Sequence, residues 1–82
     1  MKNRIEFKST AIKDLERIES KYALNIMKKI KLMEEGLVGD VKRLTNFTPE
    51  YRLRIGKFRV LFEFSADKII IYRIKHRKEL YR

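Results

Sequence analysis

The sequence contains no cysteine and only one histidine among its 82 residues. Without cysteine, the chain has neither a disulfide to stabilise its fold nor a thiolate nucleophile, and a single histidine argues against a zinc site built by the protein. The sequence also lacks an apolar run near the roughly 18 residues that span a bilayer and the apolar stretch of a signal peptide. We therefore expect a soluble cytoplasmic protein without a membrane partner, metal or other cofactor.

The length of 82 residues predicts one domain, residues 1–82. Apolar residues make up 44% of the chain, enough for one modest core. Basic residues outnumber acidic ones 21 to 11, and residues 42–82 hold 12 basic and 4 acidic side chains. A surface of this sign attracts polyanions, so nucleic acid is the first partner to consider and an anionic membrane surface the second; a purely solubilising face is the alternative.

The first half of the chain predicts a strand and two helices. Residues 2–7 alternate between apolar and charged side chains, as in a half-buried strand. Ser9 or Thr10 is expected to cap one amphipathic helix and Ser20 a second, antiparallel one that ends at Gly36. We assign the apolar stripe of the second helix to the core rather than to a ligand pocket; its members are Tyr22, Ala23, Ile26, Met27, Ile30 and Met33.

The second half predicts a loop followed by strands. Residues 37–49 have no sustained period and read as a connecting loop, held by Val41, Leu44 and Phe47. The segments YRLRI, FRVLFEFS and KIIIYRIK then follow in series, which predicts a three-stranded antiparallel meander. The expected fold is α+β: an N-terminal strand, a two-helix hairpin and the meander, with both helices on one face of the sheet.

The turn at Gly56 and Lys57 predicts the register of the first hairpin. Glycine at the first central position suits a type II′ turn, and this turn places Arg54 directly across from Arg59, with Arg52 diagonal to Arg59. Like charges opposite each other weaken a sheet. Because a structural purpose would be better served by other residues, the crowding predicts an anion-binding patch.

The register of the second hairpin has two alternatives. A two-residue loop pairs Val60 with Arg73 and places a charge in the core. A three-residue loop over residues 65–67 pairs Val60 with Tyr72 and keeps the core apolar. We prefer the second register, which predicts that Arg73 lies across from Arg59 as a fourth cation.

The tail, residues 75–82, combines an imidazole at His76, a guanidinium at Arg77 and a phenol at Tyr81. Metal-free RNA cleavage uses the ribose 2′-OH as nucleophile and needs a proton acceptor, cations for the phosphate charge and a proton donor for the 5′ oxygen. No Gly-rich phosphate loop, serine nucleophile motif or clustered acidic signature competes with this chemistry. The structural alternatives are an ordinary surface histidine and a tyrosine that covers the sheet edge.

The segments YRLRIGKFRVLFEF and KIIIYRIKHRKELYR resemble the carboxy-terminal half of the RelE/ParE superfamily of toxins from bacterial and archaeal toxin–antitoxin systems. RelE-type members of that superfamily are ribosome-dependent endoribonucleases that cut messenger RNA, whereas ParE-type members poison DNA gyrase and lack the basic catalytic set. The retained cations favour the RelE-like branch. A non-catalytic RNA-binding module is a third interpretation.

The resemblance implies a metal-independent mRNA interferase whose catalytic residues are Arg52, Arg54, Arg59, His76, Arg77 and Tyr81. Because arginine holds its proton too firmly to act as a base, the proton role falls to His76. The resemblance further implies three partners: a cognate antitoxin, the ribosome with its messenger RNA, and operator DNA reached only through the antitoxin. Additional RNA-binding residues are expected at Lys57, Arg73, Lys75 and Lys78.

Overall fold

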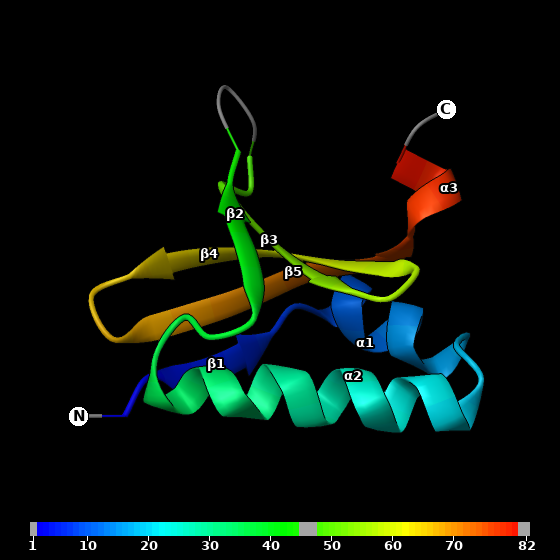
Figure 1. The fold of residues 1–82 in the computed structure, drawn as a ribbon, viewed down its shortest axis with the longest axis horizontal. Helices are drawn as coiled ribbons and strands as arrows, with labels where there is room; N and C mark the ends of the chain where they lie inside the picture. The colour runs from blue at the N-terminus through cyan, green and yellow to red at the C-terminus, as the bar shows by residue number, and fades with distance from the viewer. Residues whose placement is uncertain (1, 45–47, 81–82) are drawn as a thin grey trace.

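The computed structural model describes residues 2–44 and 48–80. Five strands form one mixed sheet in the order β1-β5-β4-β3-β2, with β1 parallel to β5 and the other pairs antiparallel. Helices α1 and α2 lie on one side of the sheet and α3 on the other (Figure 1). The predicted α+β class is confirmed. The elements are β1 (Arg4–Phe7), α1 (Ser9–Glu16), α2 (Ser20–Leu32), the 3₁₀ turn η1 (Met33–Glu35), β2 (Asp40–Arg43), β3 (Tyr51–Ile55), β4 (Phe58–Ser65), β5 (Lys68–His76) and α3 (Arg77–Leu80).

The core lies between α2 and the sheet. Ile26, Ile30 and Met33 recur at helical spacing and are at most 1% exposed. They pack against the strand residues Leu53, Ile55, Val60, Phe62, Ile69, Ile71 and Ile74. Each such side chain contributes about 1.5–3 kcal/mol when it leaves water. Two members of the predicted stripe lie at its margin instead, because Tyr22 and Met27 are 46% and 40% exposed.

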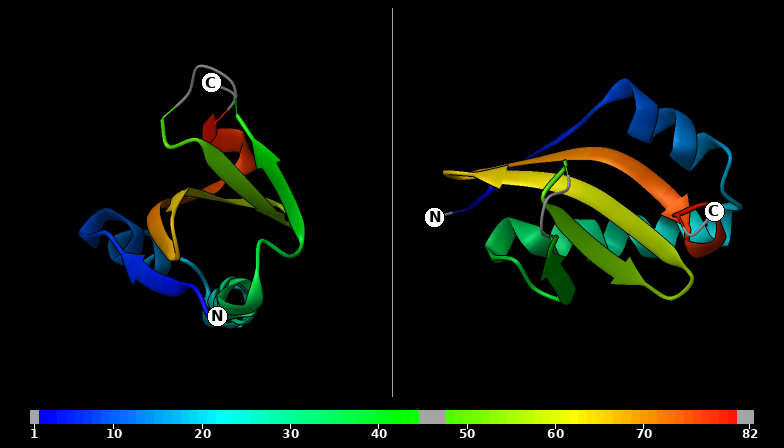
Figure 2. Two further views of the ribbon diagram at one scale, coloured as in Figure 1. Left: turned by 90° about the vertical axis from the view of Figure 1, so that its left-hand side faces the viewer. Right: turned by 90° about the horizontal axis from the view of Figure 1, so that it is seen from above.

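Helix α1 covers the edge of β5 that β1 leaves unpaired. Strand β1 pairs only with residues 68–71 of β5, and α1 lies beside the remaining edge (Figure 2). The Thr10 hydroxyl donates to the Tyr72 carbonyl at 2.7 Å, and Asp14 Oδ2 accepts the Ile74 amide at 2.9 Å. Two side chains one helical turn apart therefore take the place of a neighbouring strand and protect an edge that could otherwise pair with another chain.

The predicted helix caps at Ser9, Thr10 and Ser20 were wrong. The helices are preceded by Lys8 and Glu19, neither of which makes a side-chain cap hydrogen bond. The Thr10 hydroxyl instead donates its hydrogen bond to the Tyr72 carbonyl of β5. The contacts to the sheet outweigh local capping here, because tertiary packing supplies most of the stability of short helices in proteins.

Arg73 is bound to α1. Its Nε and Nη2 donate to the two oxygens of Asp14 at 2.8 and 3.1 Å, and Asp14 is only 8% exposed. Burial alone would raise the pKa of Asp14, but the hydrogen bonds from Arg73 and from the Ile74 amide outweigh it and lower the pKa below its ordinary 3.8. Bidentate pairs of this kind are strong and directional, so Arg73 joins the helix to the sheet.

The register of the first hairpin is confirmed. Ile55 pairs with Phe58 and Arg54 with Arg59. Gly56 has φ +56°, in the left-handed region that favours glycine at this turn position.

The preferred register of the second hairpin was wrong. The turn has two residues, because Ser65 pairs with Lys68, and Tyr72 is an extra residue between the partners of Leu61 and Phe62. Such a bulge places two residues of one strand against one of its partner, which periodicity alone does not reveal. As a result Lys75, and not Arg73, lies opposite Arg59.

The segment 37–49 is not wholly a loop. Residues Asp40–Arg43 form β2 and pair with β3, where Val41 lies opposite Leu53 and Asp40 opposite Arg54. A four-residue edge strand with one apolar residue is too short to show an alternating pattern, which explains the error. Leu44 is half-buried, and Phe47 lies outside the described residues.

No helix in residues 2–44 or 48–80 is both long and apolar enough to cross a membrane.

We predict that Asp14→Ala lowers the free energy of unfolding by about 2–3 kcal/mol, because Arg73 and the Ile74 amide both lose their acceptor. Chemical denaturation measures this loss. The matched control is Glu16→Ala on the same helix, an exposed residue for which a change within about 0.5 kcal/mol is expected.

The loss should depend on pH. The lowered pKa of Asp14 means that its contribution is complete above the ordinary pKa of 3.8 and disappears as pH falls through the pKa of the folded protein. The free energies of unfolding of the wild type and Asp14→Ala should therefore converge as the pH falls below 3.8. An equal difference at about pH 7 and about pH 2 would contradict this account of Asp14.

Candidate nucleic-acid interface

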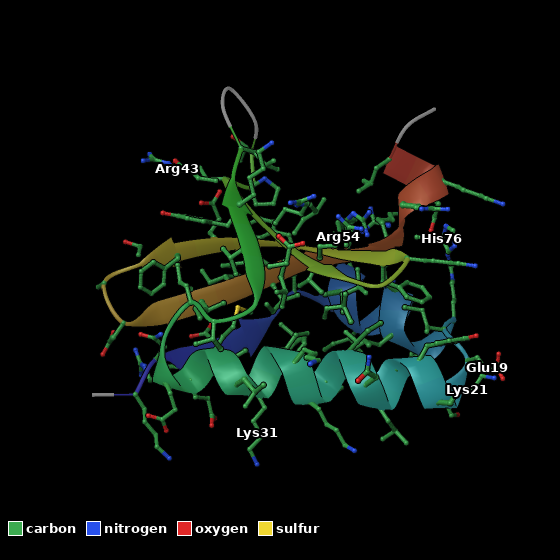
Figure 3. All side chains as sticks on the ribbon, viewed as in Figure 1. Glu19, Lys21, Lys31, Arg43, Arg54 and His76 are labelled. Atoms are coloured by element: carbon green, nitrogen blue, oxygen red, sulfur yellow. The ribbon has the colours of Figure 1, made fainter. Side chains whose placement is uncertain are left out.

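Three guanidinium groups lie on the face of the sheet opposite α2. Arg54 and Arg59 are direct cross-strand partners, and Arg52, two residues before Arg54, pairs with Leu61. Figure 3 shows Arg54 on this side of the sheet. We call Arg52, Arg54 and Arg59 the arginine cluster. The predicted convergence of these three residues is therefore present in the fold.

Arg59 is the least exposed member of the arginine cluster, at 5%. Its Nη1 donates to the carbonyls of Gly56 and Phe58, both at 2.9 Å, and thereby braces the β3–β4 turn. No carboxylate of the described residues lies within salt-bridge distance of it. A buried cation without a counter-ion costs free energy, so this site favours an added anion.

Two donors of the arginine cluster have no acceptor. The Nε atoms of Arg52 and Arg59 are buried and make no hydrogen bond to any described residue. Leaving a buried charged donor unpaired costs more than an ordinary hydrogen bond contributes. Unsatisfied donors of this kind call for a bound group, and the oxygens of a phosphate match guanidinium geometry.

Asp40 is the acidic neighbour of the arginine cluster. Its two oxygens lie 3.9 Å from Arg52 Nη2 and 3.9 Å from Arg54 Nε. These distances exceed hydrogen-bond range, and the carboxylate is 58% exposed. One carboxylate therefore offsets part of the charge of three guanidinium groups, and the arginine cluster stays positive.

Lys75 extends the charged row onto β5. It lies opposite Arg59, and its Nζ is 3.4 Å from Oε2 of Glu79 in α3. The side chain is 24% exposed. The row across four strands therefore reads Asp40, Arg54, Arg59, Lys75, with acidic partners only at its two ends.

The remaining predicted cations gather near the β3–β4 turn. The Arg77 amide donates to the Lys57 carbonyl at 2.8 Å, which attaches α3 to the turn. Lys57, Arg77 and Lys78 are exposed. Tyr81 lies outside the described residues, so its predicted catalytic role stays a prediction.

His76 and Arg73 do not join the arginine cluster. His76 pairs with Phe58, and its ring contacts the Phe58 ring edge-on at a centroid separation of 5.6 Å. Together with Tyr22 and Ile55 it lines a cavity of about 440 Å³ on the α2 side. Arg73 is held by Asp14. The bulge that assigns these side chains to their positions carries no clear sequence signal.

Sequence reasoning missed three carboxylates that organise this region: Asp14, Asp40 and Glu79. Two of them could have been found from the sequence. Glu79 stands three residues after His76, the spacing of a capping box, and Asp40 would have been placed beside Arg54 had β2 been recognised. Asp14 depends on the helix lying against the strand edge, which its own segment does not encode.

We predict that Asp40→Asn raises the affinity for single-stranded RNA about 3- to 10-fold at low salt and steepens its salt dependence, because Arg52 and Arg54 lose their competing anion. Anisotropy titrations with 2′-O-methyl RNA, which has no free 2′ hydroxyl, measure binding alone.

Glu50→Gln is the matched control for Asp40→Asn. It also removes one negative charge, but Glu50 pairs with Arg43 at 3.3 Å, outside the arginine cluster. If both substitutions raised the RNA affinity equally, the affinity would depend on net charge alone and not on the position of Asp40.

Comparison with known proteins identifies relatives over nearly the whole chain. The family described as the ParE toxin of the type II toxin-antitoxin system, parDE, matches residues 5–81. Toxin RelE3 of Methanocaldococcus jannaschii is 32% identical over 87 residues, which cover 95% of this chain and 94% of that protein.

Solved structures show the same fold. A chain of the RelB-RelE antitoxin-toxin complex from Methanococcus jannaschii is 29% identical, with a TM-score of 0.78, and the match covers 93% of this chain and 94% of that one. A chain of the RelBE2 complex from Mycobacterium tuberculosis has a TM-score of 0.81 at 18% identity, and the match covers 94% of this chain and 100% of that one. A chain of the RelE-RelB complex from Pyrococcus horikoshii has a TM-score of 0.77 at 22% identity, and the match covers 94% of this chain and 97% of that one. The family match and the RelE relatives establish that this chain belongs to the RelE/ParE superfamily of toxins of type II toxin–antitoxin systems.

Proposed function

We propose that this toxin is a ribosome-dependent endoribonuclease that cuts messenger RNA and thereby inhibits translation. The observation that carries the proposal is the arginine cluster, in which Arg59 is buried and two guanidinium Nε atoms lack acceptors among the described residues. The similarity to a protein named Toxin RelE3 supports the same branch of the superfamily.

The proposed reaction is attack by a ribose 2′ oxygen on the adjacent phosphorus. The 2′ hydroxyl gives up its proton to a water molecule, an O–P bond forms, and the bond to the 5′ oxygen breaks as that oxygen takes up a proton from water. A 2′,3′-cyclic phosphate and a 5′ hydroxyl result. This chemistry needs no metal, but it requires cations where charge builds on the phosphate oxygens.

The arginine cluster supplies those cations in the proposal. Arg52 and Arg54 contact the phosphate from β3, while Arg59 offers a donor that its bonds to the β3–β4 turn hold in place. A fixed donor needs no reorganisation when charge develops, which makes it worth roughly 100- to 1,000-fold in rate. Arg77 adds charge from α3, and Tyr81 is the proposed stacking residue for a base.

His76 is not retained as the proton carrier. Its ring lies with Phe58 and Tyr22 on the α2 side of the sheet, whereas a scissile phosphate bound by the arginine cluster lies on the other side. A general base must reach its proton directly or through one water, and Nδ1 of His76 is already occupied by the Lys78 amide.

A cognate antitoxin is the proposed protein partner. The similar toxins of known structure were solved as RelB-RelE complexes. A cationic surface is best covered by a segment of opposite charge, so we expect acid-rich antitoxin segments over the arginine cluster. Operator DNA would be contacted only through the antitoxin.

Inhibition of DNA gyrase is the second candidate function. The matching family is described as the ParE toxin, and ParE-type members of the superfamily poison DNA gyrase. This candidate predicts loss of supercoiling by purified gyrase with translation initially unaffected. The arginine cluster favours the ribonuclease, because binding a protein target does not explain buried donors without acceptors.

We predict that Arg54→Ala lowers message cleavage about 10- to 100-fold, because one phosphate-binding cation is lost. In vitro translation followed by primer extension on the message measures the cut. Arg54 suits this test because its side chain is 55% exposed, so its removal leaves the core intact.

Arg43→Ala is the control. Arg43 lies on β2, beside the strand that carries Arg54, and this exposed arginine pairs with Glu50. The variant should retain near wild-type cleavage. Intact transcripts after addition of wild-type toxin would contradict the ribonuclease, and gyrase inhibition by the same preparation would then support the second candidate.

A further inference from the structure

His76 takes part in two hydrogen bonds at the start of α3. Its Nδ1 accepts the Lys78 amide at 3.1 Å, and its own amide donates to Oε1 of Glu79 at 3.0 Å. This resembles a capping box, in which the third residue of the helix accepts the amide of the residue before the helix, although His76 accepts the amide of the second helical residue, Lys78, and not that of the third. Histidine takes the place of the usual serine or threonine.

The cap determines how the His76 ring is used. A backbone amide can only donate, so Nδ1 offers its lone pair and the ring proton resides on Nε2. The other ring contact is the edge-on packing against Phe58. The Nδ1 contact leads to α3, and the ring contact leads to the α2 side of the sheet.

Helix α3 depends on such bonds because it has only four residues. Helices this short are not stable in isolation. Besides the capping box, its first turn is held by the Arg77 amide, which donates to the Lys57 carbonyl at 2.8 Å, and by Lys75, whose Nζ lies 3.4 Å from Glu79. These bonds attach α3 on the side of the sheet away from α2 (Figure 1).

We propose that His76 is a positioning residue. Together with Glu79 it holds α3 so that Arg77 stays on the side of the arginine cluster. The effect on cleavage rests on the proposed function, whereas the effect on α3 does not.

The test compares His76→Ala with His76→Asn. Asparagine accepts an amide at a helix start as well as any residue but carries no titratable proton. We expect His76→Ala to lower message cleavage about tenfold, and His76→Asn to stay within about threefold of wild type. Lys31→Ala, on the outer surface of α2, is the control and should cleave normally.

Hydrogen exchange at the Lys78 amide, which donates to His76, gives a readout that does not require cleavage. Exchange should accelerate about tenfold in His76→Ala and remain near wild type in His76→Asn. Unchanged exchange in His76→Ala would overturn the proposal. So would a His76→Asn protein that is protected in α3 yet as inactive as His76→Ala, because a proton-carrying role would then be indicated. If wild-type toxin fails to cleave, the proposed function fails and the exchange rates alone decide the role of His76.

Discussion

A single extra residue in β5 determines which side chains share a face of the sheet. Strict alternation continued from Ile71 would direct Arg73 and Lys75 into the core and Ile74 out of it. The bulge at Tyr72 reverses the alternation, so Ile74 is buried at 2% exposure and Lys75 reaches the row of the arginine cluster. Burying two cations against α2 would cost several kcal/mol each unless carboxylates met them. The division between an apolar face and a cationic face therefore depends on this irregularity.

The parts of the fold that follow from periodicity and turn chemistry could be predicted from the sequence. The Gly56 turn fixed one hairpin correctly because two-residue loops admit few registers. The predicted register of the second hairpin was wrong because it assumed a regular strand. The structure keeps the core apolar by inserting a bulge instead. Strand β2 was missed because a single apolar residue, Val41, carries no period. The position of α1 could not be predicted either, since Thr10 and Asp14 act on a strand about 60 residues away in the chain.

The candidate site could be predicted only in part, because a sequence shows arginines without their partners. Arg54 and Arg59 were placed correctly by the hairpin. Arg73 was misplaced, and its two bonds to Asp14 give it a structural use that composition cannot distinguish from phosphate binding. Arg43 pairs with Glu50 at the rim. Arg73 has a carboxylate within hydrogen-bond distance, whereas Asp40 stays 3.9 Å from Arg52 and Arg54, and this difference in partner distance becomes visible only in the fold.

Arg59 combines these two uses, which affects how its substitution should be interpreted. Its Nη1 braces the β3–β4 turn through two carbonyls, while its Nε lacks an acceptor among the described residues. The same turn receives the Arg77 amide at Lys57, so α3 is attached to the part of the sheet that Arg59 stabilises. Removing Arg59 would loosen the turn and the helix as well as remove a cation, and a loss of activity would not by itself report phosphate binding. An anion bound at Nε would in turn compensate the buried charge. Ligand binding and hairpin stability are therefore linked through one side chain, and each should strengthen the other.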